Sequence, residues 1–444
     1  MQVDLVLVNV KVYTREGVVD AGLAIDDGRI VKVAKETRLP KADSRMDLKE
    51  KLALPGLIDS HVHLRDQELA YREDFHSGTS AAAAGGVTTV VDMPNNRPFT
   101  MSVETLKERM RLSESRILVN VGFNSAFPAE TDEIRRIVEA GAIGFKLYLL
   151  QQLGGVNIDD DEALLNAFKS MSKTKVPISV HAEDKSTLEK AKKNLLEQGR
   201  NDLNAFLKSH PPTAEEKAVN RVAELAKKSG AHVHICHVSS AIGLRAVLKA
   251  KRMSSSVTCE VTPHHLLLSA QHLKKFGSLA LEIPPLRTSR DVNALWRALQ
   301  KGFIDTIGSD HAPHSFEEKS AGSVWDVKPG IVGLETMLPL LLTEVNRGRL
   351  TIDQLVHFTC EKPAEIFHLK DRGKLDTGFF ADVTVVDLKK EHRIDASKFY
   401  SKAKFSPFEG WKVKGKAVRT FVGGKLIMDE GEIVAKPGTG RIIR

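Results

Sequence analysis

Two histidines separated by one residue, His61 and His63, end a run of apolar residues typical of a buried β-strand. Side chains at positions i and i+2 of a strand point to the same face, so the two imidazoles are expected to project together. Convergent imidazoles are typical of metal sites, but one such pair is weak evidence, because a buried histidine is often a satisfied part of the core.

Four more polar residues occur at matching places, in or at the end of otherwise apolar strand patterns. They are Lys146 in GFKLYL, His181 in SVHAED, His237 in HICHVS and Asp310 in IGSDHAPH. Unpaired polar groups would be costly there. Four imidazoles and a carboxylate converging on one place suit a borderline divalent ion such as Zn²⁺. Core histidines explain any one of these residues but not the set, so we interpret the set as a metal site.

Lys146 is chemically different from the other members of this set. An ammonium group has no lone pair and cannot lie beside two metal ions. If the lysine reacts with carbon dioxide, it becomes an anionic carbamate (N6-carboxylysine) whose two oxygens can bridge two metals. The alternative is an unmodified lysine paired with a nearby acid.

The middle of the chain alternates short β-rich runs with amphipathic helical patterns. Strands are predicted to end within residues 58–63, 87–92, 117–123, 143–148, 178–183, 233–237, 257–262 and 304–310. Eight such units in about 250 residues are typical of a (β/α)8 TIM-like barrel, whose active sites lie at the carboxyl ends of the strands. A doubly wound sheet is disfavoured, because no Gly-rich phosphate turn follows these strands.

The two ends of the chain differ from this middle part. Residues 1–54 and 373–444 are rich in strand and turn patterns, and neither is long enough to be a convincing domain alone. We therefore expect them to pair into one composite β-sandwich domain packed against a barrel domain of residues 55–372.

Composition excludes several other classes of protein. The 444 residues are 42% hydrophobic and 27% charged, as in a globular protein, and no apolar stretch is long enough for a membrane span. The net charge of +8 is spread along amphipathic segments without a basic stripe, so nucleic-acid binding is not expected. With three cysteines and no signal-like N-terminus, we expect a cytoplasmic protein without a disulfide scaffold.

Motifs along nearly the whole chain resemble the amidohydrolase superfamily, and within it most closely the dihydroorotase family of cyclic amidohydrolases. They are LPGLIDSHVHLRD, GGVTTVVDMPNN, GFKLYL, HAED, HICHVS, TPHHL, PPLR, GSDHAPH, GIVGLET and GKLDTGFFADVTVVDL. The resemblance implies a (β/α)8 barrel with an added β-sandwich, which agrees with the element pattern.

The resemblance also implies two metal sites, Zn²⁺ in both, with Mn²⁺ or Co²⁺ as alternatives, and a hydroxide bridging them. The first would use His61, His63, Lys146 and Asp310, and the second Lys146, His181 and His237, with Lys146 carboxylated and shared. Asp310 would be the catalytic general acid and base. We assign structural roles to the remaining histidines of these motifs, which are His232, His234, His264 and His265.

Substrate contacts follow from the same resemblance. Arg65 would bind the carboxylate that distinguishes dihydroorotate from neutral ureides, since an anion favours a bidentate arginine. The full set of predicted substrate-binding residues is His63, Arg65, Asn95, His314, Pro329 and Gly330. One position departs from the family pattern, because Ile283 stands before PPLR where the family usually has Asn.

The activity implied is the reversible cyclisation of N-carbamoyl-L-aspartate to (S)-dihydroorotate plus water, the third step of pyrimidine (UMP) biosynthesis. Alternatives are another cyclic amidohydrolase, of the allantoinase or hydantoinase/dihydropyrimidinase type, and a non-catalytic scaffold relative. The expected partner is this small-molecule substrate, with no nucleic acid and no membrane, and a homo-oligomer is compatible with the sequence.

Overall fold

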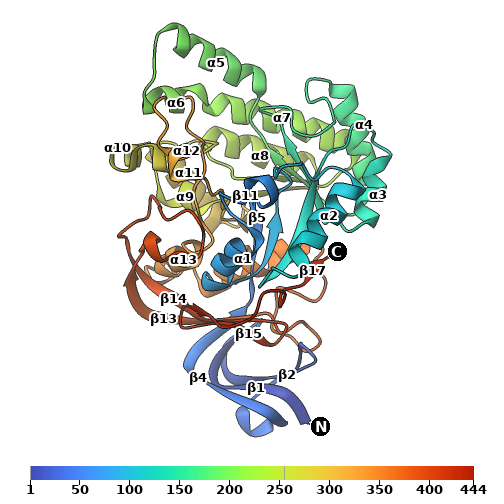
Figure 1. The fold of residues 1–444 in the computed structure, drawn as a ribbon, viewed down its shortest axis with the longest axis vertical. Helices are drawn as coiled ribbons and strands as arrows, with labels where there is room; N and C mark the ends of the chain where they lie inside the picture. The colour runs from blue at the N-terminus through green and yellow to red at the C-terminus, as the bar shows by residue number, and fades with distance from the viewer. Residues whose placement is uncertain (1, 255) are drawn as a thin grey trace.

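Eight parallel strands form a nearly closed barrel in the computed structural model, which describes residues 2–254 and 256–444 (Figure 1). In chain order they are β5 (Leu57–Val62), β6 (Val87–Asp92), β7 (Asn120–Ala126), β8 (Gly144–Tyr148), β9 (Ile178–His181), β10 (Val233–Ile235), β11 (Val257–Val261) and β12 (Thr306–Ile307). The first and last strands meet through a parallel bridge between Val62 and His311, and the His63 amide donates to the His311 carbonyl at 2.9 Å. The predicted fold class is confirmed.

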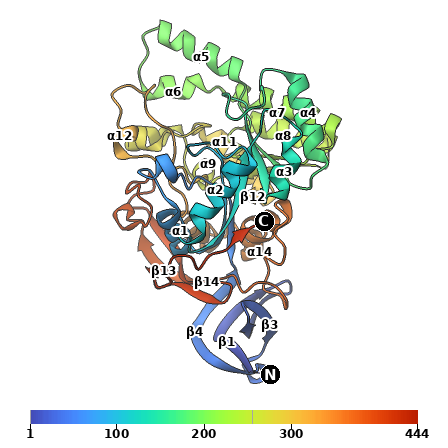
Figure 2. The same ribbon diagram turned by 45° about the vertical axis from the view of Figure 1, so that its right-hand side comes forward.

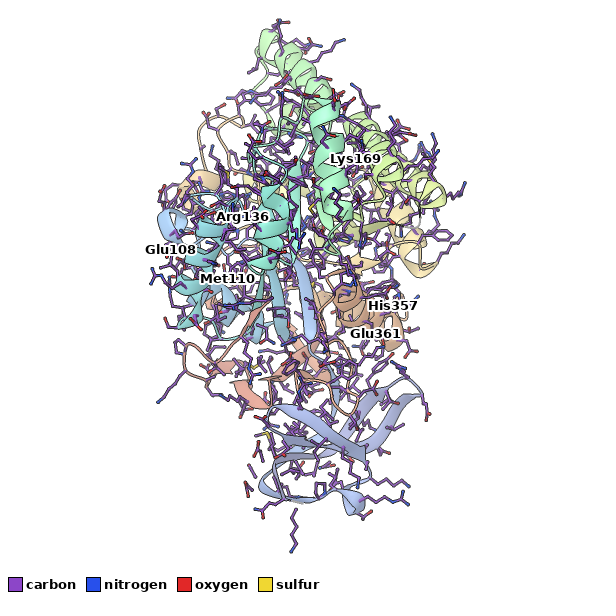
Figure 3. The ribbon with its side chains drawn as sticks, turned by 90° about the vertical axis from the view of Figure 1, so that its right-hand side faces the viewer. Glu108, Met110, Arg136, Lys169, His357 and Glu361 are labelled. Atoms are coloured by element: carbon purple, nitrogen blue, oxygen red, sulfur yellow. The ribbon has the colours of Figure 1, made fainter. Side chains whose placement is uncertain are left out.

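Helices surround this barrel. Figure 3 shows three of them side by side, marked by Glu108 on α2, Arg136 on α3 and Lys169 on α4. The α-helices are α1 (Phe75–Ala84), α2 (Val103–Glu114), α3 (Glu133–Glu139), α4 (Asp161–Ser172), α5 (Lys185–Glu197), α6 (Leu203–Ser209), α7 (Pro212–Ser229), α8 (Ala241–Met253), α9 (Pro263–Leu267), α10 (Leu273–Phe276), α11 (Ser289–Gln300), α12 (Phe316–Lys319), α13 (Met337–Asn346), α14 (Ile352–Val356) and α15 (Lys362–Ile366). None of the described helices is long and apolar enough to cross a membrane.

Local sequence explains where these helices begin and end. The side chains of Asp74 and Ser102 accept hydrogen bonds from backbone amides of the first turns of α1 and α2, which leaves fewer unpaired donors there. At the other end of α7, Gly230 adopts a left-handed conformation with φ of 75°, which glycine adopts without strain. The helix is thereby stopped before β10.

The second sheet combines both ends of the chain (Figure 2). Its strand order is β16 (Glu432–Ile433), β15 (Lys425–Asp429), β14 (Lys412–Val422), β13 (Val383–Arg393), β4 (Lys41–Pro55), β1 (Gln2–Thr14), β2 (Gly17–Asp26) and β3 (Arg29–Ala34). Only the β1–β4 pair is parallel. Apolar residues of both ends, among them Leu7, Leu23, Val385 and Phe421, share one buried core. The final strand, β17 (Ile442–Ile443), pairs instead with β7 of the barrel.

Two barrel strands differ from the apolar runs that predicted them. Residues 117–119 precede β7, because their backbone bonds elsewhere: the Leu118 amide donates to Thr79, and the Ile117 carbonyl accepts from Gly438 and Gly440. In β12 the ladder ends at Ile307, since the amide of Ser309 donates to the Asp59 side chain at 2.9 Å. An apolar run thus marks a buried segment but not its hydrogen-bond partners.

A buried ion pair connects α2 to the end of β6. Both Nε and Nη2 of Arg109 donate to Asp92 Oδ2, and both side chains are about 1% exposed. The second terminal nitrogen, Nη1, donates to the carbonyl of Arg65 at 3.0 Å. This pair therefore fixes the loop that follows β5.

Replacing Arg109 by Met should leave the Asp92 carboxylate buried without its partner. Breaking a buried pair in this way costs about 3–5 kcal/mol, and the loss is measured as the free energy of unfolding in urea. Arg111→Met on the same helix is the control, because Arg111 pairs with Glu108 on the exposed surface and its loss should change stability little. Equal stability of the two variants would show that the buried pair of Arg109 and Asp92 does not stabilise the fold.

Candidate active site

The residues predicted to bind metal gather at the carboxyl ends of the barrel strands. His61 lies in β5 and His63 follows it, while Lys146 lies in β8 and His181 ends β9. His237 and Asp310 follow β10 and β12 by two and three residues. All six line one cavity of about 270 Å³.

Asp310 lies between the two histidines of the H-x-H pair. Its Oδ1 is 3.3 Å from His61 Nε2 and 3.1 Å from His63 Nε2. On the other side of His61, the ring of His237 lies 5.2 Å away between centroids, and the ring of His181 lies 4.6 Å from that of His237. The four imidazoles and the carboxylate therefore form one continuous cluster.

Burial controls the protonation of these imidazoles. It lowers the pKa of His63 to about 3 and lowers the pKa of His181 and of His237. His61 is the exception, because the nearby Asp310 carboxylate outweighs burial and raises its pKa to about 10. Neutral imidazoles carry the lone pair that a metal ion requires, and cation binding at His61 would displace its extra proton.

Two buried groups lack the partners that a protein core without a metal ion would be expected to give them. His237 Nδ1 has no hydrogen-bond partner among the described residues. Lys146 Nζ contacts only His61 Nε2 at 3.2 Å and Cys236 Sγ at 3.0 Å, and the described part of the chain provides no carboxylate to pair with it. The alternative of a lysine paired with an acid is thus not seen, and a set of imidazoles with a carboxylate suits Zn²⁺.

Two buried glutamates that the sequence reasoning missed orient the imidazoles. Glu260 in β11 accepts from His61 Nδ1 at 2.8 Å, and Glu183 lies 2.8 Å from His181 Nε2. Such partners fix the tautomer and the ring orientation of a metal-binding histidine. The signal for Glu260 was an acid inside the apolar run VTCEV, and Glu183 lies two residues after His181.

The predicted anion-binding residues lie in the same cavity. Arg65 Nη2 is 3.3 Å from His314 Nε2, and Arg65 Nε donates to the Pro313 carbonyl at 3.3 Å. Asn95 Oδ1 lies 2.6 Å from His63 Nδ1. When His63 donates this bond, its Nε2 carries the lone pair facing Asp310, and the Asn95 amide nitrogen is left as a donor.

Backbone geometry around Arg65 is unusual. Three successive residues, Arg65, Asp66 and Gln67, have φ between 51° and 58°, a region that non-glycine residues rarely adopt. Surrounding structure must stabilise such a conformation, and the bond from Arg109 to the Arg65 carbonyl does so. The arginine side chain is thereby turned back over the cavity.

The last two predicted substrate residues occupy different places. Pro329 lines the cavity, whereas Gly330 packs behind it, where a Cβ atom would collide with Ala312 and His314. The amide of Gly330 donates to the Leu281 carbonyl, and the fully buried Lys319 donates to both the Leu281 and Gly330 carbonyls at 2.9 and 2.8 Å. Sequence reasoning missed Lys319, because it lies in a polar stretch.

Of the histidines assigned structural roles, three have protein partners. His232 and His234 each contact Thr258 at 3.0 Å, and His265 lies 2.8 Å from Thr262 Oγ1 and 2.9 Å from the Pro284 carbonyl. His264 differs, since its Nε2 is buried without a partner among the described residues and lies near Asp310 and Glu282.

Fold and site together define a class of protein: a (β/α)8 barrel whose cavity holds buried imidazoles and a carboxylate, a donor set that suits a metal ion. Comparison with known proteins gives the family. A family model described as "Amidohydrolase family" matches residues 52–427. The chain belongs to the amidohydrolase family, whose members are generally metal-dependent, and it is a hydrolase that acts on cyclic amides.

Individual relatives fall into two groups. The dihydroorotase of Methanothermobacter thermautotrophicus is 39% identical over 99% of this chain and 97% of its own length. The L-hydantoinase of Paenarthrobacter aurescens is 32% identical over 99% and 98%. Among solved structures, an L-hydantoinase (dihydropyrimidinase) from Arthrobacter aurescens aligns with a TM-score of 0.95, at 32% identity and 99% coverage of both chains.

Removing the charge of Glu260 should weaken metal retention. Glu260→Gln keeps the shape of the side chain but loses the carboxylate that faces His61 Nδ1, and changes to such partners typically cost 10–100-fold in metal affinity. Metal content after dialysis against graded chelator measures the effect. Glu224→Gln, on the exposed face of α7, is the control; equal retention by the two variants would show that Glu260 plays no part.

Proposed function

We propose that the protein is a dihydroorotase, which interconverts N-carbamoyl-L-aspartate and (S)-dihydroorotate plus water in pyrimidine synthesis. The observation that carries this proposal is the environment of Arg65. Its side chain is buried at 6% exposure and lines the cavity, yet the described residues offer it no carboxylate within 4 Å. Burial lowers its pKa only to about 10, so it stays charged at neutral pH. A buried cation that faces an open cavity without a carboxylate partner favours an anionic ligand.

Two metal ions would complete the site. His61, His63 and Asp310 would hold the first, His181 and His237 the second, and a carboxylated Lys146 would bridge them. When bound, the ions would lower the pKa of a water molecule and polarise the ring carbonyl. Zn²⁺ is the proposed metal, two per chain, with Mn²⁺ or Co²⁺ as alternatives.

The protein's own groups would then carry out the proton transfers. In hydrolysis, Asp310 accepts a proton from the attacking water and delivers it to the ring nitrogen as the C–N bond breaks. Arg65, Asn95 and His314 hold the substrate carboxylate at the other end of the cavity, and Pro329 forms the wall beside the ring, with Gly330 packed behind it. In the synthetic direction the same steps run in reverse.

A hydantoinase or dihydropyrimidinase activity is the second candidate. The L-hydantoinase structure with a TM-score of 0.95 favours it, as does the apolar Ile283 in the cavity wall. The deciding experiment assays metal-replete protein side by side with N-carbamoyl-L-aspartate, dihydroorotate, hydantoin, allantoin and dihydrouracil. Turnover of a neutral ureide together with none of dihydroorotate would overturn the dihydroorotase proposal.

Arg65→Met should lower kcat/KM for dihydroorotate at least about 10-fold, because hydrogen bonds to a charged group contribute about 1.5–3 kcal/mol. Dihydrouracil has no carboxylate, so its kcat/KM should change little. Arg97→Met is the control, since Arg97 also lines the cavity but is exposed. Equal losses on the two substrates would mean that Arg65 does not recognise the carboxylate.

Asp310→Asn should retain metal, because the amide oxygen can still coordinate, but it should lose proton transfer. Positioned acids and bases contribute typically 10²–10⁴-fold, so we expect kcat to fall at least about 10²-fold. Steady-state kinetics with metal analysis of the same sample separates the two effects. A metal-loaded variant with normal turnover would place the base elsewhere.

A further inference from the structure

Arg287 is a buried arginine to which the proposed function gives no role. It is 6% exposed and lies two residues before α11. A guanidinium loses its hydration on burial, and this is unfavourable unless protein groups match its donors and its charge. The partners of Arg287 therefore show which parts of the structure it holds together.

On one side the guanidinium meets residues that follow β9. Arg287 Nη2 lies 3.8 Å from Glu183 Oε1, and Nη1 donates to the carbonyl of His210. His210 Nδ1 in turn lies 3.2 Å from the same Glu183 oxygen. The other oxygen, Glu183 Oε2, is 2.8 Å from His181 Nε2. The carboxylate that orients a proposed metal ligand is thus held in place by Arg287 and His210.

On its other side the guanidinium meets the segment that follows β10. Arg287 Nε donates to Ser239 Oγ at 3.0 Å, and Ser239 lies two residues after His237. The Ser239 amide donates to Glu215 Oε1 in α7 at 2.7 Å, so this segment is also fixed from the outer helix. One arginine therefore contacts both segments from which the second proposed metal ion would take its histidines.

The strand ladder alone does not fix these two histidines relative to each other. The last paired residues of β9 and β10 are Val180 and Ile235, so His181 and His237 lie beyond this pairing. Their ring centroids are nevertheless only 4.6 Å apart. Side-chain contacts must therefore hold the two rings at this separation, and the contacts of Arg287 span the gap.

We propose that Arg287 is a positioning residue for the second metal ion, the one that His181 and His237 would bind. It acts through Glu183 and Ser239 and touches neither metal nor substrate. The inference rests on the proposed two-ion site and deepens it. The described hydrogen bonds and ion pairs of Arg287 include no ligand of the first ion. Loss of these contacts should therefore weaken the second ion selectively.

The test is Arg287→Lys, which keeps a positive charge near Glu183 but loses the planar fork that reaches three partners at once. Protein loaded with Zn²⁺ is dialysed against graded chelator, and the bound metal is counted per chain. We expect the affinity for one of the two ions to fall at least about 10-fold, while the other is retained as in the wild type. Arg290→Lys, on the exposed surface three residues later, is the control.

Two further variants identify the ion and guard against a failure to fold. Glu260→Gln acts on His61, a proposed ligand of the first ion. The double variant with Arg287→Lys should therefore release both ions early, whereas each single variant releases one. Ser239→Ala removes the partner of Arg287 Nε and keeps the arginine, so it should weaken the second ion in the same direction even if Arg287→Lys does not fold.

Three results would overturn the proposal. They are unchanged retention of both ions in Arg287→Lys and Ser239→Ala, equal weakening of both ions together with a lower melting temperature of the metal-free protein, and a wild type that binds fewer than two ions per chain. The second result would assign Arg287 a purely structural role. Substrate choice is a separate outcome: a two-ion wild type that prefers hydantoin would refute the dihydroorotase proposal and leave the role of Arg287 intact.

Discussion

Contact of the Asp310 carboxylate with His61 and His63 is the interaction on which the rest of the site depends. These residues come from the two strands that close the barrel, and the Val62–His311 bridge lies beside them. Barrel closure and assembly of the proposed metal site are therefore one structural event, since neither can form while β5 and β12 are apart. This also explains why β12 is short: the amide of Gly308 still donates to the Val261 carbonyl of β11, but the next amide, that of Ser309, donates to Asp59.

The anion-binding end of the cavity depends on a different constraint, the buried pair of Arg109 and Asp92. Asp92 ends β6 and also accepts from the amide of Leu64, while Arg109 holds the carbonyl of Arg65. Together these bonds stabilise three consecutive residues in a backbone conformation that is rarely populated. The orientation of the cavity arginine is thus set by a helix on the outside of the barrel.

Sequence reasoning found the residues whose type conflicts with their surroundings. Histidines, a lysine and an aspartate at the ends of apolar strands are conspicuous, and the strand period alone places them on one face. It missed Glu260 and Lys319 for separate reasons. The importance of Glu260 follows only from its contact with His61 across the barrel, and Lys319 lies in a polar stretch that gives no sign of burial. Each depends on tertiary contacts, which periodicity does not encode.

The buried charges of the cavity bear on which kind of substrate it favours. Lys146 and Arg65 are both buried, line the same cavity and have no carboxylate partner among the described residues. Two unpaired buried cations are unfavourable unless each meets an anion. The proposed reaction with carbon dioxide would replace the positive charge of Lys146 by a negative one and would create a metal ligand, whereas Arg65 has no such chemistry and needs an anion from outside. A neutral ureide would leave Arg65 uncompensated each time it binds, so the electrostatics of this cavity favour a substrate that carries its own carboxylate.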